Sequence, residues 1–194
     1  KYEAAWGVPL PVTPGLNLNA MMKTLGDGIR GLFVMGEDLL LSEPNLSRIE
    51  QGMNRVEFVV LQEPFLNETA RFADVILPSA VFAEKDGCFT NTERRVQRVR
   101  KAVEPPGEAR ADWQILIALA RACGADWRFA GVAEVFAELV RDAPRFAGLS
   151  HERLELGSGD RTEREGAGEP THRSDFRREQ VEDAVLHLET VPEG

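Results

Sequence analysis

Three short apolar runs, separated by segments with helical spacing, most constrain the fold of this chain. They occupy residues 32–35, 58–61 and 75–77. Continuous apolar strands that alternate with helices are typical of a parallel sheet covered on both faces. The right-handed crossover rule then fixes the hand of each strand–helix–strand unit. The pattern therefore predicts an α/β fold built on a parallel β-sheet covered by helices.

The segments around these runs carry helix signals. Residues 45–54 place Leu46, Ile49 and Met53 on one face, and residues 18–25 predict a short surface helix. Residues 67–73 predict another short helix. Its N-cap is expected to be Asn67, because an Asn side chain accepts hydrogen bonds from the first helical amides.

The pattern becomes less regular after Pro78. Residues 88–92 and 95–99 alternate in a way that predicts an extended hairpin. A helix is expected from Asp112, as its cap, to Cys123, and a further helix over 133–142. We therefore expect one domain over 1–154, with a ligand-binding unit at about 30–100 and a helical appendage over 112–154.

Residues 155–194 form a charged tail of low complexity in which large apolar residues are almost absent. Such a segment buries too little surface to offset its chain entropy, so we expect an acidic, disordered tail. The three histidines, His151, His172 and His187, lie in or beside this tail and are predicted to be surface residues.

Charge and cysteine content exclude several classes of function. The formal net charge of -9 disfavours nucleic acid as a partner, because phosphate backbones require clustered Lys and Arg. Cys88 and Cys123 are far apart, form no CxxC pair and indicate a reducing compartment, so a cytoplasmic location is expected. Both are predicted to be buried small hydrophobes. No apolar run approaches the roughly 20 residues of a membrane span.

Polar residues follow two of the apolar runs. Gly36, Glu37 and Asp38 come after the first run, and Gln62 and Glu63 after the second. Ligands of open parallel sheets bind at the carboxyl ends of the strands. Carboxylates accept hydrogen bonds from ribose hydroxyls or a purine amino group, and a Gln amide both donates and accepts. The pattern predicts a site for an anionic, nucleotide-like ligand; solvated turns remain an alternative, since GxGxxG and P-loop motifs are absent.

The residue pattern adds Asp74 and two helix starts to the predicted site. Asp74 immediately precedes the third apolar run. Backbone N–H groups at the helix starts near Asn45 and Asn67 are expected to be available to a phosphate.

Two blocks of sequence carry a specific resemblance. ETA-x-x-ADVILP spans residues 68–78 and EKDG-x-F-TNTERRVQ spans 84–97. With their surroundings, over about 2–154, they resemble the molybdopterin oxidoreductase family, and most closely its formate dehydrogenase α-subunit branch. The resemblance implies Rossmann-like domains of the type found in domains 1–3 of formate dehydrogenase and DMSO reductase. It also implies a molybdenum or tungsten ion held between two molybdopterin guanine dinucleotides.

The resemblance also assigns roles to individual residues. It implies that Gly36, Glu37, Asp38 and Ser42 lie along one dinucleotide, and that Gln62 reads its sugar or guanine region. Glu63 and Asp74 are implied to lie nearby, although Asp74 could instead cap its strand. For the basic cluster of Arg94, Arg95, Arg98, Arg100 and Lys101, the resemblance implies a place near the cofactor or at a subunit contact, and a solvated face of the hairpin is the alternative.

Other parts of the family pattern are not in this sequence. Leu39 stands where the family usually has Pro, and the four-cysteine segment for a 4Fe-4S cluster is absent. The metal-ligating Cys or selenocysteine and the C-terminal pterin-binding domain are absent too, so no residue is assigned a catalytic or metal-ligating role.

We therefore expect an internal fragment, truncated at both ends, of an enzyme that oxidises formate to CO2. By itself it should be inactive. Its partners would be the missing portions of that enzyme or other formate dehydrogenase or respiratory subunits. The alternatives are a non-catalytic scaffold, similar to the large iron–sulfur subunit of NADH–quinone oxidoreductase, and a free-standing nucleotide-binding domain.

Overall fold

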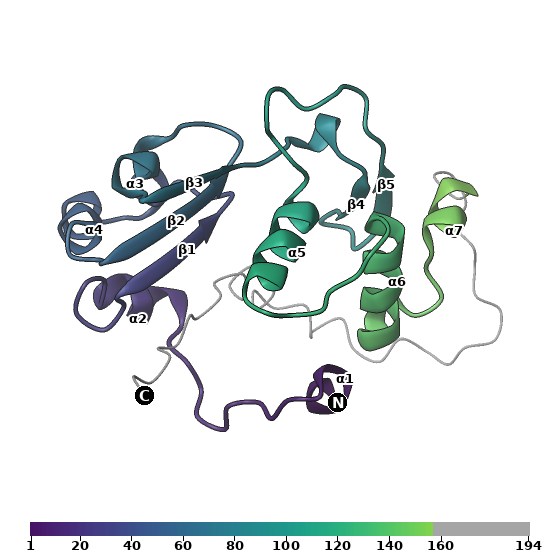
Figure 1. Cartoon of the computed structure of the whole chain (residues 1–194), viewed down its shortest axis with the longest axis horizontal. Coiled ribbons are helices and arrows are strands. Elements are labelled where there is room, and N and C mark those ends of the chain that lie inside the picture. The colour runs from purple at the N-terminus through teal and green to yellow at the C-terminus, as the bar shows by residue number, and fades with distance from the viewer. Residues whose placement is uncertain (157–194) are drawn as a thin grey trace. The chain divides into compact units, whose positions relative to one another are not determined.

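The computed structural model describes residues 1–156, which form two compact units (Figure 1). The sheet unit is Pro14–Pro78, and the hairpin unit consists of Lys1–Thr13 together with 79–156. The expected ligand-binding unit at about 30–100 therefore includes both the whole parallel sheet and, from the other unit, the hairpin.

The sheet unit contains the parallel sheet that the three apolar runs predicted. Its strands lie in the order β1-β2-β3, with β2 in the centre (Figure 1). The register pairs Val34 with Leu61 and Leu61 with Ile76, so the three carboxyl ends lie along one edge. The strands are β1 (Gly31–Met35), β2 (Phe58–Glu63) and β3 (Val75–Pro78).

Short helices connect these strands. Asn67 caps η1 as predicted, because its side chain accepts a hydrogen bond from the amide of Ala70. The helix α3 was not predicted, and it is only one turn long, with Asp38 as its N-cap. The helical elements of the sheet unit are α2 (Leu18–Lys23), α3 (Leu39–Ser42), α4 (Leu46–Met53) and the 3-10 helix η1 (Glu68–Phe72).

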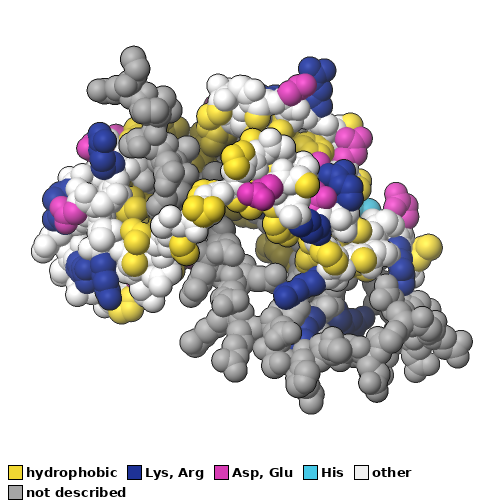
Figure 2. Space-filling model, turned by 90° about the horizontal axis from the view of Figure 1, so that it is seen from below, with side chains coloured by type: hydrophobic (Ala, Val, Ile, Leu, Met, Phe, Trp, Pro, Cys, Tyr) yellow, Lys and Arg dark blue, Asp and Glu magenta, His cyan; other side chains and the backbone are white. Residues whose placement is uncertain are grey.

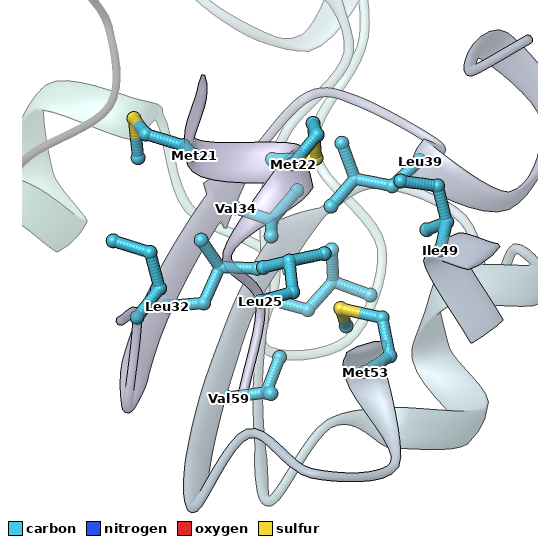
Figure 3. Close-up of a cluster of buried hydrophobic side chains, with 11 residues drawn as sticks. Met21, Met22, Leu25, Leu32, Val34, Leu39, Ile49, Met53 and Val59 are labelled. Carbon is cyan, nitrogen blue, oxygen red and sulfur yellow. The ribbon is translucent and has the colours of Figure 1, made fainter. Parts of the chain in front are cut away.

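The core of the sheet unit lies between α2, α4 and one face of the sheet. Figure 3 shows Leu25, in the turn after α2, and Met53 of α4 directed toward Val34 and Val59 of the strands. Leu25 and Leu61 are almost completely buried. Gly52 lets α4 approach the turn after α2 closely, since a Cβ there would lie 2.6 Å from the Cβ of Leu25.

The hairpin unit contains the predicted antiparallel hairpin, followed by helices (Figure 1). The strand-like segment after Pro78 makes one bridge, between Ser79 and Arg110. The strands are β4 (Gly87–Thr90) and β5 (Val96–Val99). The helices are α1 (Tyr2–Trp6), η2 (Phe82–Glu84), α5 (Asp112–Ala122), α6 (Val132–Asp142), η3 (Pro144–Phe146) and α7 (His151–Leu156).

Four predictions about the hairpin unit were wrong. Ala111, not Asp112, is the N-cap of α5, because Asp112 is already the first helical residue, and its carboxylate pairs with Lys85. Cys123, the C-cap of α5, is exposed, and Cys88 of β4 is only half-buried. His151 is buried rather than exposed, because its ring stacks on Phe136 of α6.

The predicted tail is only partly described. Its first two residues, Glu155 and Leu156, belong to α7. The rest of the tail, with His172 and His187, lies outside the described residues.

Large apolar side chains also reach the surface of both units. The loop between β2 and η1 exposes Phe65 (69%) and Leu66 (80%), and the hairpin unit exposes Phe82 and Phe89. Figure 2 shows hydrophobic side chains between charged ones on one face of the molecule.

Two kinds of feature are missing from residues 1–156. No helix in this part of the chain is long and apolar enough to cross a membrane. Nor do three or more His, Cys, Asp or Glu side chains gather there in a way that could hold a metal ion.

Candidate functional site at the carboxyl edge of the sheet

The turn after β1 begins with a glycine that faces open space. The amide of Gly36 donates to the carbonyl of Gln62 (3.0 Å), which continues the strand pairing one residue past β1. Gly36 has φ +66°, a conformation that L side chains rarely adopt, and a Cβ built there would meet nothing within 4 Å. Its backbone is therefore open to close approach by a ligand.

Asp38 joins the turn after β1 to the start of η1. Its Oδ1 accepts from the hydroxyl (2.7 Å) and the amide (3.2 Å) of Thr69, and from the amide of Leu40 (3.2 Å). Its Oδ2 accepts from the amide of Glu68 (3.4 Å). These bonds occupy the carboxylate with protein donors, so Asp38 holds the edge in shape.

Glu37 is the carboxylate of this turn that remains available. Its side chain is exposed and, within residues 1–156, makes no hydrogen bond or ion pair. Only its backbone carbonyl is engaged, through a long hydrogen bond from the Asn67 side chain (3.5 Å). Glu37 can therefore accept hydrogen bonds from a ligand that lies against Gly36.

Three other predicted residues lie at the same edge. Gln62 is completely buried in the central strand, next to the half-buried Glu63. Ser42 ends α3, and its hydroxyl donates to the carbonyl of Asp38 (2.9 Å). The structure thus brings Gly36, Glu37, Asp38, Ser42, Gln62 and Glu63 together at the carboxyl edge.

Asp74 lies at the opposite, amino edge of the sheet. Its carboxylate accepts from the amide of Val59 (2.7 Å), and its own amide donates to the carbonyl of Val59 (2.9 Å). The strand β3 begins after it and runs toward the other edge. This geometry favours the alternative in which Asp74 caps the sheet and touches no ligand.

Replacing Asp74 by alanine tests that role. We expect Asp74→Ala to lower the free energy of unfolding by about 1.5 kcal/mol, because the Val59 amide loses a charged acceptor. Amide spectra of Gly36 and Glu37 should stay unchanged. Glu57→Ala is the matched control, since Glu57 precedes β2 and its carboxylate, within residues 1–156, pairs with nothing but the exposed Arg30 side chain. Urea unfolding of the three chains measures the difference; equal losses in both variants would refute a capping role.

The start of η1 does not offer the phosphate donors that were expected there, and at the start of α4 the amide of Arg48 is also occupied. The Asn45 side chain accepts from the amide of Arg48, and that of Asn67 from the amide of Ala70. The amides of Glu68 and Thr69 are bonded to Asp38. Because protein acceptors occupy these donors, the edge suits hydroxyl and amino groups better than a phosphate.

Thr69 is a structural residue that sequence reasoning missed. It is completely buried, and its hydroxyl makes the shortest hydrogen bond to Asp38. The two residues are 31 positions apart. The ETA block contains Thr69, but no periodicity in the sequence indicates which side chain it meets.

Comparisons with known proteins agree on one family. The sequence model of the molybdopterin oxidoreductase family matches residues 7–122. The chain is 41% identical over 156 residues to a probable oxidoreductase, YjgC, of Bacillus subtilis, covering 80% of this chain and 16% of the relative. It is 42% identical over 157 residues to the F420-dependent formate dehydrogenase subunit alpha of Methanocaldococcus jannaschii, covering 80% of this chain and 23% of the relative.

The fold also resembles a solved structure. Acetylene hydratase from Pelobacter acetylenicus superposes with a TM-score of 0.56 at 22% identity, over 71% of this chain and 19% of the other. That likeness concerns the mixed α/β fold with its parallel sheet. The chain spans between 16% and 23% of the length of the curated relatives named above.

Proposed function

Because the chain belongs to the molybdopterin oxidoreductase family, we propose that the carboxyl edge of its parallel sheet forms one wall of a molybdopterin guanine dinucleotide site. The observation that carries the proposal is the open backbone at Gly36, with φ +66°, beside the available carboxylate of Glu37. Ligands of open parallel sheets bind at this edge.

The residues present fit the nucleoside end of such a cofactor. Glu37 would accept hydrogen bonds from the ring N–H and amino group of guanine, and Gly36 would let the base approach the backbone. Asp38 and Thr69 would hold both in place, because their mutual hydrogen bonds fix the turn. Ser42, Gln62 and Glu63 would border the ribose, while the phosphates would need cations from outside this edge.

The larger activity is also part of the proposal. Formate dehydrogenase α subunits among the relatives support formate, oxidised to CO2, as the substrate of the intact enzyme. A bis-molybdopterin guanine dinucleotide with molybdenum or tungsten would supply the two-electron redox centre. The described residues supply binding and orientation only, so partner segments of the same enzyme, or further subunits, would bring the metal ligand and a 4Fe-4S cluster.

Titration with guanosine tests the proposed wall. We expect the backbone amide signals of Gly36 and Glu37 in the 194-residue chain to shift, with a dissociation constant of about 1 mM, since only part of the site is present. Adenosine, which lacks the ring N–H donor, should bind more weakly. The substitution Glu37→Ala should weaken guanosine binding by at least about tenfold, because it removes the acceptor of both hydrogen bonds, and even one bond to a charged acceptor is worth about 1.5 kcal/mol.

Two results would contradict this assignment. Shifts that miss the Gly36 turn, or a Glu37→Ala variant that binds guanosine equally well, would favour the non-catalytic scaffold. The exposed Phe65 and Leu66 beside this edge are the observation in favour of that alternative, because exposed apolar loops often contact partners. Metal analysis and guanine release from natively purified protein would then be expected to find neither.

A further inference from the structure

The hairpin unit has a cavity of about 580 Å³ whose wall carries a buried histidine. His151, the first residue of α7, is only 8% exposed. Its ring stacks on Phe136 of α6, with centroids 5.0 Å apart and an angle of 26° between the planes. Within residues 1–156 its Nε2 is buried and has no hydrogen-bond partner. This environment accommodates a neutral imidazole and offers no acceptor to the second proton of a charged one.

The helix α7 is held to the hairpin by one carboxylate. Glu155 Oε1 lies 3.2 Å from Nε of Arg98, and Glu155 Oε2 pairs with Arg100. Arg98 also donates to the carbonyls of Gly87 (2.9 Å) and Val99 (2.7 Å) and lies 3.4 Å from Asp86. Arg98 thus joins β4, β5 and α7.

Charged groups from several elements surround His151. Arg98 of β5 opposes its protonation, whereas Asp86, Glu152 and Glu155 favour it. Two of those carboxylates already pair with Arg98, and α6 contributes only the uncharged Phe136. The remaining charged residues of the cavity wall are Glu84, Lys85, Lys101 and Glu104, of which Lys101 pairs with Glu104 and Lys85 with Asp112.

We propose that protonation of His151 releases α7 from the hairpin, so that the contact between α7 and β5 is closed at neutral pH and opens in mild acid. A charged imidazole would lie buried beside Arg98 without an acceptor at Nε2, and moving α7 outward would place it in water. The departure of α7 would remove Glu155 from Arg98 and Arg100. The base of the hairpin would then lose both ion pairs with α7.

The direction of the pH effect follows from the pKa of His151 when α7 is docked and when it is undocked. Burial, and then the charge of Arg98, lower the pKa of His151 in the docked state below its ordinary value of 6.5. The undocked ring titrates near 6.5, so it binds more protons than the docked ring just below that pH. The stability of docking is therefore independent of pH above about pH 6.5, falls as the pH drops from there toward the docked pKa, and levels off below it. The pKa of Glu155 is lowered by Arg100, so its own loss of charge belongs to a more acidic range.

An NMR titration of the 194-residue chain from pH 7.5 to pH 5 tests the proposal. We expect the helical Cα shifts of residues 151–156 to be lost in acid, with the open fraction rising by up to about tenfold per pH unit between pH 6.5 and the docked pKa. His151→Phe keeps a ring against Phe136 without a titratable group, so its α7 should stay docked throughout. His151→Gln provides a second uncharged variant.

Matched variants distinguish the release of α7 by His151 protonation from a general effect of acid on the protein. His172→Gln should behave as the unchanged chain. Arg100→Gln should weaken docking at every pH, because Glu155 loses a partner, but keep the same dependence on pH. The proposal is overturned if α7 of the unchanged chain shows no transition above pH 5, if both His151 variants keep that transition, or if the His151 ring titrates above 6.5.

Discussion

Asp38→Ala is expected to lower the free energy of unfolding of the sheet unit by about 3 kcal/mol, since a helix cap and the partner of a buried hydroxyl are lost together. The carboxylate of Asp38 accepts from the amides of Leu40, Glu68 and Thr69. The hydroxyl of the completely buried Thr69 would be left without its acceptor.

The sheet unit contains no Trp, so Trp fluorescence would not report on its unfolding. Hydrogen exchange of the β1 and β2 amides measures the loss of stability instead. Glu37→Ala is the control: it removes the neighbouring exposed carboxylate, and its cost should stay within about 0.5 kcal/mol. Asp38→Asn, which keeps one acceptor oxygen, should fall between the two. A loss in Asp38→Ala no larger than that in Glu37→Ala would show that the junction does not stabilise the fold.

Gly26→Ala should be still more destabilising, by about 4 kcal/mol, because it combines left-handed backbone strain with overpacking. Gly26 has φ +77° after α2, and a Cβ there would lie 2.2 Å from the Cβ and 3.0 Å from the backbone carbonyl carbon of Arg55. The backbone of Arg55 cannot move aside without disturbing the end of α4.

Gly36→Ala provides a matched control for that substitution. Gly36 has a similar φ of +66° but no atom near the added methyl, so only the backbone strain of about 1 kcal/mol should remain. Urea unfolding followed by circular dichroism compares the two variants. If the two variants lose the same free energy of unfolding, the contact of the added methyl group with Arg55 contributes nothing.

Much of the fold could be predicted from local patterns. The strands β1, β2 and β3 follow from continuous apolar runs, and α4 and α6 from apolar residues at helical spacing. Asn67 was recognised as a cap because capping depends on residues three positions away. These signals act within a few residues, so they are visible in the sequence.

The candidate site was predictable only in part. Six of its seven predicted residues meet at one edge because parallel strands align their carboxyl ends. Asp74 was grouped with them by its closeness to β3, but the direction of that strand puts it at the other edge. The phosphate donors expected at η1 were assigned without knowing that Asp38 occupies them.

The sequence by itself determined the three parallel strands, the longer helices α4, α5 and α6, the polar turn after β1 and the family resemblance, since each depends on neighbouring residues or short motifs. The tertiary structure decided which polar groups are available. Asp38 is bonded to Thr69, 31 residues away, and Glu37 next to it is not. It also buried His151 against Phe136, although local composition predicted a surface position. Both outcomes depend on contacts between distant segments, which form only when the chain packs.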